Sequence, residues 1–146
     1  MNAENNIDQN VLEMLNSQDP TLKTDALFNL TVEEVDNEVI KTIIQLVRED
    51  DKSVKNAASN FLIQNNNSSI PFEIINYISS ADISIRNLAG EILLRKGVKS
   101  LDAICKRLPE IKVDDDIKFL VDIVGLIGDK SPENLLINIL TINKNE

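Results

Sequence analysis

One short pattern recurs along the chain at a nearly constant spacing. It consists of an aspartate, two residues of any type, an apolar residue and then lysine or arginine. The four copies are Asp19-Pro-Thr-Leu22-Lys23, Asp51-Lys-Ser-Val54-Lys55, Asp82-Ile-Ser-Ile85-Arg86 and Asp114-Asp-Asp-Ile117-Lys118. Their aspartates are 32, 31 and 32 residues apart. A fixed period in this range predicts a repeat architecture.

Each copy of the pattern predicts the first turn of a helix. The aspartate stands where an N-cap belongs, because its carboxylate can accept hydrogen bonds from the unpaired N–H groups of that turn. Pro20 falls at the first helical position, where its missing N–H is not needed. Residues three, seven, ten and eleven positions after the aspartate share one face of a helix. Two of these inward columns are Ala26, Ala58, Ala89 and Val121, and Leu30, Leu62, Leu93 and Gly125.

A second apolar segment follows each of these helices after a turn. The four segments cover residues 39–47, 74–78, 101–108 and 136–140. Apolar residues three or four apart in each segment predict a second helix with one buried face. We therefore expect each unit to be a helical hairpin of about thirty residues, in which the alanine column lets the first helix lie close to its partner. Residues 7–17 predict the second helix of a leading half repeat.

This pattern resembles the HEAT-like repeat in its short form, whose first helix opens with an aspartate, an apolar residue, a basic residue and then an alanine. The resemblance covers residues 19 to about 142 and implies an all-α fold, a right-handed alpha-alpha superhelix of about four and a half hairpins. We expect a single domain over residues 1–146, with full repeats at 19–48, 51–79, 82–109 and 114–142.

The basic residue of each repeat has two interpretations. In families of this kind the aspartate and the basic residue often form a ladder of ion pairs along the stack, and the resemblance implies the same here. The alternative is a row of cations that binds an anion. The residues concerned are Lys23, Lys55, Arg86 and Lys118.

The residue types present exclude several kinds of chemistry. The chain has no histidine and one cysteine, which rules out serine–histidine catalysis, histidine metal ligation and an internal disulfide. Cys105 follows Ile104 on the inward face of its helix, which predicts a buried, inert thiol. The run Asp114-Asp115-Asp116 could suggest a metal site, but the helix dipole favours acids at a helix start and no calcium-loop spacing follows. We expect no enzyme, no cofactor and no metal.

Membrane and secretory signals are missing from the sequence. The N-terminal residues are polar, and no apolar run approaches the ~18 residues of a membrane-spanning helix. A lone cysteine favours a reducing compartment. Together these features predict a cytoplasmic protein.

Charge is distributed unevenly along the chain. The formal net charge is −9, and residues 1–51 alone carry twelve acidic and three basic residues. One interpretation is a solvated surface that keeps the protein soluble. The other is an acidic end that steers a basic protein partner, with a steering group formed by Glu33, Glu34, Asp36 and Glu38. Residues 95–112 hold six basic and two acidic residues, which is too short a basic stripe to favour nucleic acid as a partner.

The second helices carry the candidate binding surface, because the resemblance implies that they line the concave side of the superhelix. The residue two positions after an inward residue points most directly outward. That column and the one beside it contain the candidate partner-binding residues, which are Glu13, Met14, Gln45, Leu46, Asn76, Tyr77, Lys106, Arg107 and Asn138. Leu46 and Tyr77 are expected either to form a small hot spot or to complete the packing between neighbouring helices.

The last predicted helix is apolar on more than one face, through Leu135, Ile137 and their neighbours. A terminal repeat needs a polar outer face to stay soluble. We therefore expect this helix to be covered by a second copy of the chain, a further domain or a partner; the alternative is that it packs back on the fourth repeat. Leu135 and Ile137 are the candidate docking residues for self-association.

The leading functional hypothesis is a non-catalytic protein–protein interaction module. Small size, acidity and the lack of catalytic groups suit an acidic inhibitor, for example an immunity protein that occludes a basic nuclease toxin. The alternative is a scaffold or adaptor subunit of a larger assembly, or a homo-oligomer. A more distant alternative is a HEAT-like nucleic-acid-binding protein that uses the basic residues between Arg95 and Lys112.

Overall fold

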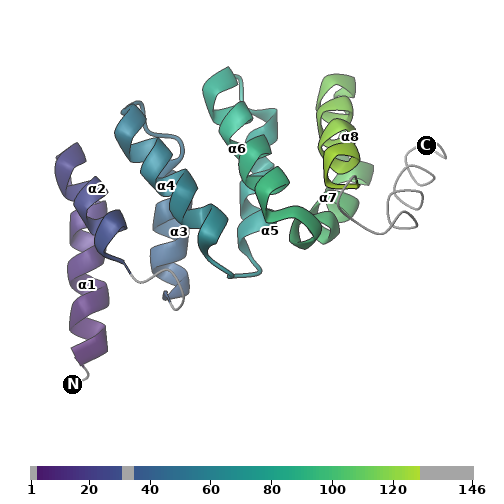
Figure 1. Ribbon diagram of the computed structural model, residues 1–146. Helices are drawn as coiled ribbons and strands as arrows, with labels where there is room; N and C mark the ends of the chain where they lie inside the picture. Colours follow the sequence, from purple (N-terminus) through teal and green to yellow (C-terminus); the bar gives the residue numbers. More distant parts are fainter. Residues whose placement is uncertain (1–2, 31–34, 129–146) are drawn as a thin grey trace. The chain divides into compact units, whose positions relative to one another are not determined.

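The computed structural model describes residues 3–30 and 35–128, and within these ranges the chain is all-α, with no strand (Figure 1). The α-helices are α1 (Ala3–Leu15), α2 (Pro20–Asn29), α3 (Asn37–Leu46), α4 (Lys52–Gln64), α5 (Ile70–Ile74), α6 (Ile83–Lys96), α7 (Leu101–Arg107) and α8 (Asp114–Gly128). The 3-10 helices η1 (Ile75–Ser79), η2 (Gly97–Ser100) and η3 (Leu108–Glu110) directly follow α5, α6 and α7. No helix in these ranges is both long enough and apolar enough to cross a membrane.

The repeated aspartates start three of the four first helices, as predicted. The N-caps of α2, α4 and α6 are Asp19, Asp51 and Asp82. Their carboxylates accept hydrogen bonds of 2.9, 3.0 and 2.9 Å from N–H groups of the first turn. The prediction is wrong for Asp114, which is the first residue of α8. The carbonyl of Val113 accepts the first backbone hydrogen bonds of that helix, so Val113 takes the capping position.

The segments predicted to form second helices are helical wherever the structure describes them. Segment 39–47 is α3 with its C-cap, and 101–108 is α7 with the start of η3. Segment 74–78 is divided between the end of α5 and η1. The leading helix α1 begins and ends earlier than the predicted range 7–17. The segment 136–140 lies outside the described residues.

The chain divides into two compact units between Ile70 and Pro71, a point that lies within α5. In the first unit α1 packs against α2 and α3, and α4 packs against the same two helices (Figure 1). The core includes the fully buried Leu15 and Leu62, with Ala58 of the alanine column between helices. The extensive contacts of α2 are thus with α1 and α4, which corrects the expectation that α2 and α3 form the closely packed hairpin.

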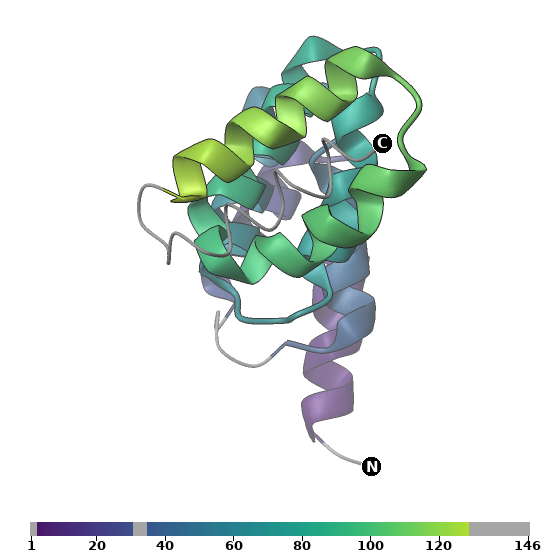
Figure 2. The same ribbon diagram turned by 90° about the vertical axis from the view of Figure 1, so that its right-hand side faces the viewer.

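In the second unit α6 packs against both η1 and α8, and α7 packs against η1 (Figure 2). Ala89, Ile92 and Leu93 of α6 are fully buried, as are Ile104 of α7 and Leu120 of α8. The three alanines of the alanine column, Ala26, Ala58 and Ala89, are therefore buried, whereas Val121, its fourth member, is partly exposed. That the two units belong to one repeat domain, and that they follow a right-handed superhelix, stay predictions.

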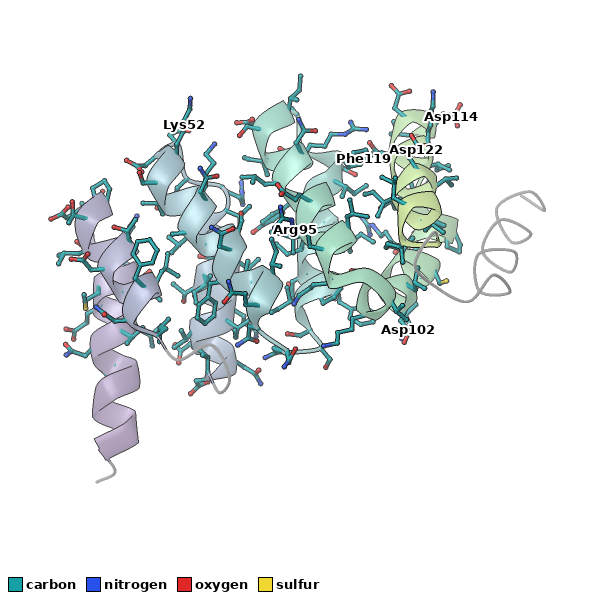
Figure 3. The ribbon with its side chains drawn as sticks, viewed as in Figure 1. Lys52, Arg95, Asp102, Asp114, Phe119 and Asp122 are labelled. Atoms are coloured by element: carbon teal, nitrogen blue, oxygen red, sulfur yellow. The ribbon has the colours of Figure 1, made fainter. Side chains whose placement is uncertain are left out.

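A glycine allows α6 and α8 to approach closely. A Cβ atom built on Gly90 would lie 2.5 Å from Cζ of Phe119, far inside normal contact. Figure 3 shows Phe119 between the two helices. The guanidinium carbon of Arg86 lies 5.0 Å from the centroid of the same ring. Phe119 thus lies against a glycine and an arginine of one helix.

Two of the repeated cations pair with acids further along the chain. Lys23 forms an ion pair with Glu49. Arg86 Nη1 lies 3.3 Å from Oδ1 of Asp116, and the Ser79 hydroxyl donates a hydrogen bond of 2.8 Å to the same carboxylate. Arg86–Asp116 thus joins two predicted repeats, whereas Glu49 lies between the predicted repeats 19–48 and 51–79. The acids differ from the capping aspartates that we expected, because the capping carboxylates are already bonded to backbone N–H groups.

Candidate binding cleft

A small cleft lies in the second unit, between the segment formed by α5 and η1 and the segment formed by α7 and η3. Its volume is about 150 Å³. The residues that line it are Phe72, Ile75, Asn76, Ala103, Lys106, Arg107 and Glu110. Apolar groups of both segments therefore meet two cations, an amide and a carboxylate in one place.

The buried faces of the two segments decide which residues reach the cleft. On α5 and η1 the side chains of Ile74 and Ile78 are fully buried, and Asn76, two positions from each, is exposed. On α7 the side chain of Ile104 is fully buried, and Lys106, two positions later, is exposed in the same way. The apolar spacing that builds the core thus also places an amide and an ammonium group at the surface.

The two cations of the cleft have defined contacts. Lys106 Nζ lies 5.2 Å from the centroid of the Phe72 ring, which is within the range of a cation–π contact. Arg107 Nη1 lies 3.2 Å from Oε2 of Glu110. The Nε atom of Arg107 is buried and has no hydrogen-bond partner among the described residues. Because a buried unpaired donor costs about 1–3 kcal/mol, an acceptor that reached Nε would lower the free energy of the site.

The cleft is small compared with typical ligand sites. Sites for cofactors and drug-sized ligands typically measure about 300–1,000 Å³. A cleft of about 150 Å³ has room for one side chain. Its carboxylate, Glu110, is ion-paired with Arg107.

Most of the residues predicted to bind a partner lie at the surface. The column expected to point outward is exposed in all four described members, Glu13, Gln45, Asn76 and Lys106. Three members of the neighbouring column are partly buried, and these are Met14, Tyr77 and Arg107. Asn138 lies outside the described residues. The structure brings Asn76, Lys106 and Arg107 together in the cleft, and partner binding by this set stays a prediction.

Leu46 requires a correction. Its side chain is only 5% exposed, so it belongs to the core of the first unit and cannot form a surface hot spot with Tyr77. The reason is the wide apolar face of α3, which also buries Ile43, Ile44 and Val47. The buried face of α3 is therefore wider than the row of apolar residues that the sequence pattern predicts for the core, and it includes Leu46. The packing alternative therefore holds for Leu46.

The described steering residues, Asp36 and Glu38, are both exposed. Asp36 also has a structural role, because its carboxylate caps α3 and accepts a hydrogen bond of 3.0 Å from the N–H of Glu38. Four further predicted site residues lie outside the described part of the chain, namely Glu33, Glu34, Leu135 and Ile137.

The run Asp114-Asp115-Asp116 does not gather into a metal-binding group. Asp114 and Asp115 are exposed, whereas Asp116 is buried and paired with Arg86. Across residues 3–30 and 35–128, no three acidic, histidine or cysteine side chains lie close enough together to hold a metal ion.

The basic segment between Arg95 and Lys112 is partly occupied by local contacts. Arg95 Nη2 lies 3.2 Å from Oε1 of Glu91, one helical turn away. Arg107 is paired with Glu110, and Lys106 lies over Phe72. The two ion pairs, Arg95–Glu91 and Arg107–Glu110, offset part of the charge that the segment can offer to a phosphate backbone.

Two titratable groups outside the cleft have shifted pKa values. Burial lowers the pKa of Lys96 to about 8, and repulsion by Lys99 adds to the effect. Burial raises the pKa of the Cys105 thiol, and the negative charge of Asp102 adds to that shift. Cys105 is partly exposed, which corrects the expectation of a buried thiol. It lies at the edge of the face that buries Ile104, because adjacent helical residues point in different directions.

Two cleft residues, Phe72 and Glu110, are absent from the set predicted from the sequence. Glu110 follows Lys106 by four residues and Arg107 by three, a spacing that brings opposite charges together on a helix, so a signal for it exists. Phe72 precedes the apolar segment 74–78 and meets Lys106 of a different helix. No sequence signal marks that contact.

No protein-family model matches the chain, and a search of curated proteins finds no match either. The resemblance to HEAT-like repeats accordingly rests on the repeated residues alone. Function has to be inferred from the chemistry and geometry of the surface.

Proposed function

We propose that the chain is a non-catalytic protein-binding module that acts as an acidic inhibitor of a basic protein, such as a nuclease toxin. In this proposal the repeats form a right-handed HEAT-like superhelix and the second helices face the partner. The supporting observation is that Asn76, Lys106 and Arg107, three residues of the predicted outward surface, line one cleft with room for a single side chain. Protein interfaces concentrate their binding energy in a few residues, which often fill pockets on the partner.

The acidic first unit supplies the attraction at long range. Residues 1–70 carry twelve acidic and five basic residues. Among the acids at exposed positions are Glu13, Asp25, Glu38 and Asp50. A surface of one charge sign raises the association rate of an oppositely charged partner, and salt screens this effect.

Inhibition then follows from occlusion. The acidic surface accelerates the encounter, and short-range contacts such as those in the cleft slow dissociation. The inhibitor covers the working surface of its partner and carries out no reaction itself. Because the acidic surface acts on the encounter, we expect charge changes in the first unit to alter the association rate more than the dissociation rate.

The proposal is tested by affinity capture from a lysate of the native host, followed by kinetic analysis of the retained protein. We expect one basic protein in stoichiometric amount, released as the salt concentration rises. The variant Glu13→Lys/Glu38→Lys should then lower its association rate by roughly tenfold at low salt, because electrostatic steering accelerates association by about 10–1,000-fold.

A matched pair of substitutions in the second unit provides the control. The control variant is Asp114→Lys/Asp122→Lys. Asp114 lies in the first turn of α8, as Glu38 does in α3, and Asp122 lies on a helix surface, as Glu13 does. Asp114 and Asp122 are both exposed (Figure 3). The two double variants change the net charge of −9 by the same amount. Equal slowing by both would show that only net charge matters and would contradict steering by the first unit. Retention of no basic protein would contradict the inhibitor.

A further inference from the structure

We propose that the cleft lined by Phe72, Asn76, Lys106 and Arg107 binds the carboxylate of an aspartate or glutamate side chain presented by a protein partner. This inference rests on the proposed function, because it names the kind of side chain that the protein-binding module receives. It concerns the second unit alone.

The charge of the lining favours an anion. Lys106 and Arg107 are cations, and Glu110 is the one anion among the lining residues. The sum is one positive charge, which a carboxylate neutralises. The amide of Asn76 adds N–H donors that a carboxylate can accept.

The Arg107 side chain has donors left for such a ligand. Glu110 engages Nη1 at 3.2 Å, and Nε is buried without a partner among the described residues. Carboxylates bind guanidinium groups through two parallel hydrogen bonds. Because Nε is buried, the guanidinium has to turn toward the cleft before Nε and Nη2 can donate such a pair. Glu110 is itself 67% exposed, so it leaves the cleft accessible while it orients the guanidinium.

Lys106 is positioned by the ring beneath it. Its ammonium group lies 5.2 Å from the centroid of Phe72. This contact restricts a side chain that otherwise has four rotatable bonds, so less conformational entropy is lost when an anion binds. Phe72 also gives the cleft an apolar wall for the methylene groups of an incoming aspartate or glutamate.

The small volume of the cleft, about 150 Å³, suits a side chain. One acidic side chain fits this space, whereas a nucleotide or cofactor needs several times more.

The inference is tested by NMR titration of the whole protein with two blocked peptides, acetyl-Gly-Glu-Gly-amide and acetyl-Gly-Gln-Gly-amide. The chain has four arginines, so the Nε–H signal of Arg107 is assigned by its loss in Arg107→Gln. We expect the glutamate peptide to shift this signal in a saturable manner. Its midpoint concentration should be about tenfold or more below that of the glutamine peptide, because a hydrogen bond to a charged group is stronger than one to a neutral group.

Three variants locate the binding. Arg107→Lys keeps the charge but lacks the two-donor edge, and it should weaken the shifts of the α7 backbone amides about tenfold or more. Lys106→Gln should weaken them as well. Arg95→Gln removes one positive charge from α6 in the same unit, where Arg95 is exposed and paired with Glu91, and it should leave the titration unchanged (Figure 3). The dispersion of the amide spectrum checks that each variant is folded.

The following results would overturn the inference. Equal midpoints for the two peptides would exclude recognition of the carboxylate. If Arg95→Gln and Arg107→Gln weakened binding of the glutamate peptide equally, the peptide would be attracted by overall positive charge and would not occupy the cleft. Acetate binding as tightly as the glutamate peptide would assign the cleft to small free anions. A protein that still captured a basic partner but failed these titrations would retain the proposed function and lose only this assignment.

Discussion

Arg86 connects two helices through three contacts. Its guanidinium lies over the ring of Phe119, pairs with Asp116 at 3.3 Å, and donates a hydrogen bond of 3.3 Å to the carbonyl of Asp115. Asp116 is buried and also accepts from Ser79, so both partners of the ion pair are tied to further groups. A partly buried, hydrogen-bonded pair of this kind is costly to break from one side. Arg86 thus holds α6 to α8.

Among single residues, Lys96 is expected to give the free energy of unfolding its clearest dependence on pH. Its pKa is about 8 in the folded protein and 10.5 in an unperturbed lysine. Between these values the unfolded chain binds more protons than the folded chain, so the free energy of unfolding rises with pH across this window. Below about pH 8 both states are protonated and the cost of burying the charge is fully present.

The variant Lys96→Met removes this charge. We expect it to raise the free energy of unfolding at neutral pH and to flatten the rise between about pH 8 and pH 10.5, measured by urea denaturation. Both proteins should carry Cys105→Ser. The raised pKa of the Cys105 thiol makes the free energy of unfolding fall as the pH rises above 9.0, the ordinary value of a thiol, and this fall would mask the rise caused by Lys96. The exposed Lys112→Met is the control, and a profile equal to that of Lys96→Met would contradict the prediction.

At the scale of helices, the contact between α6 and α8 depends on a missing side chain. Gly90 faces the Phe119 ring, whereas among the described residues no atom lies within 4 Å of a Cβ built on Gly125 of α8. Both glycines are inside helices. They therefore share the same propensity cost, about 1 kcal/mol relative to alanine, and differ in the space around them.

Alanine substitution separates these two effects. Gly125→Ala should raise the free energy of unfolding by up to about 1 kcal/mol. Gly90→Ala should lower it by about 1–2 kcal/mol, because overpacking costs typically about 1–3 kcal/mol and displaces Phe119 from Arg86. Urea denaturation of both variants measures the difference. Stabilisation by Gly90→Ala as large as that by Gly125→Ala would show that the ring moves aside without cost.

Helix positions could be predicted from the sequence because their signals are local. An aspartate, an apolar residue three positions later and an alanine at position seven define the start and inner face of a helix without reference to the rest of the chain. Asp19, Asp51 and Asp82 are caps for this reason. Asp114 departs from the pattern because two more acids follow it, and the helix dipole accepts any of them in its first turn.

The partners of each helix, and part of the cleft, could not be predicted in the same way. Asn76 and Lys106 were placed correctly at the surface by their distance from inward residues. Leu46 was misplaced because the width of the α3 face depends on what packs against it. Phe72 was missed because its contact with Lys106 joins two separate helices. Periodicity describes one helix at a time and carries no information on such pairs.

At the scale of the whole molecule, the division between Ile70 and Pro71 predicts how the protein opens. Proteins open locally in cooperative groups of elements, and repeat proteins owe most of their stability to contacts between neighbours. We therefore expect Gly90→Ala to speed hydrogen exchange in α6 and α8, roughly tenfold for each 1.4 kcal/mol lost, and to leave α2 and α4 unchanged. Equal acceleration of the slowest amides in all four helices would indicate one cooperative unit. Gly125→Ala is the control.

The extensive helix contacts within each unit join elements that are close in the sequence. Chains with such local contacts fold in about microseconds to milliseconds, because little loop entropy is lost before the contacts form. A ribosome adds about 5–20 residues per second, so residues 71–146 take seconds to synthesise after residue 70 has been added. The acidic first unit is therefore expected to leave the ribosome, and to be able to fold and meet a partner, before the cleft has emerged.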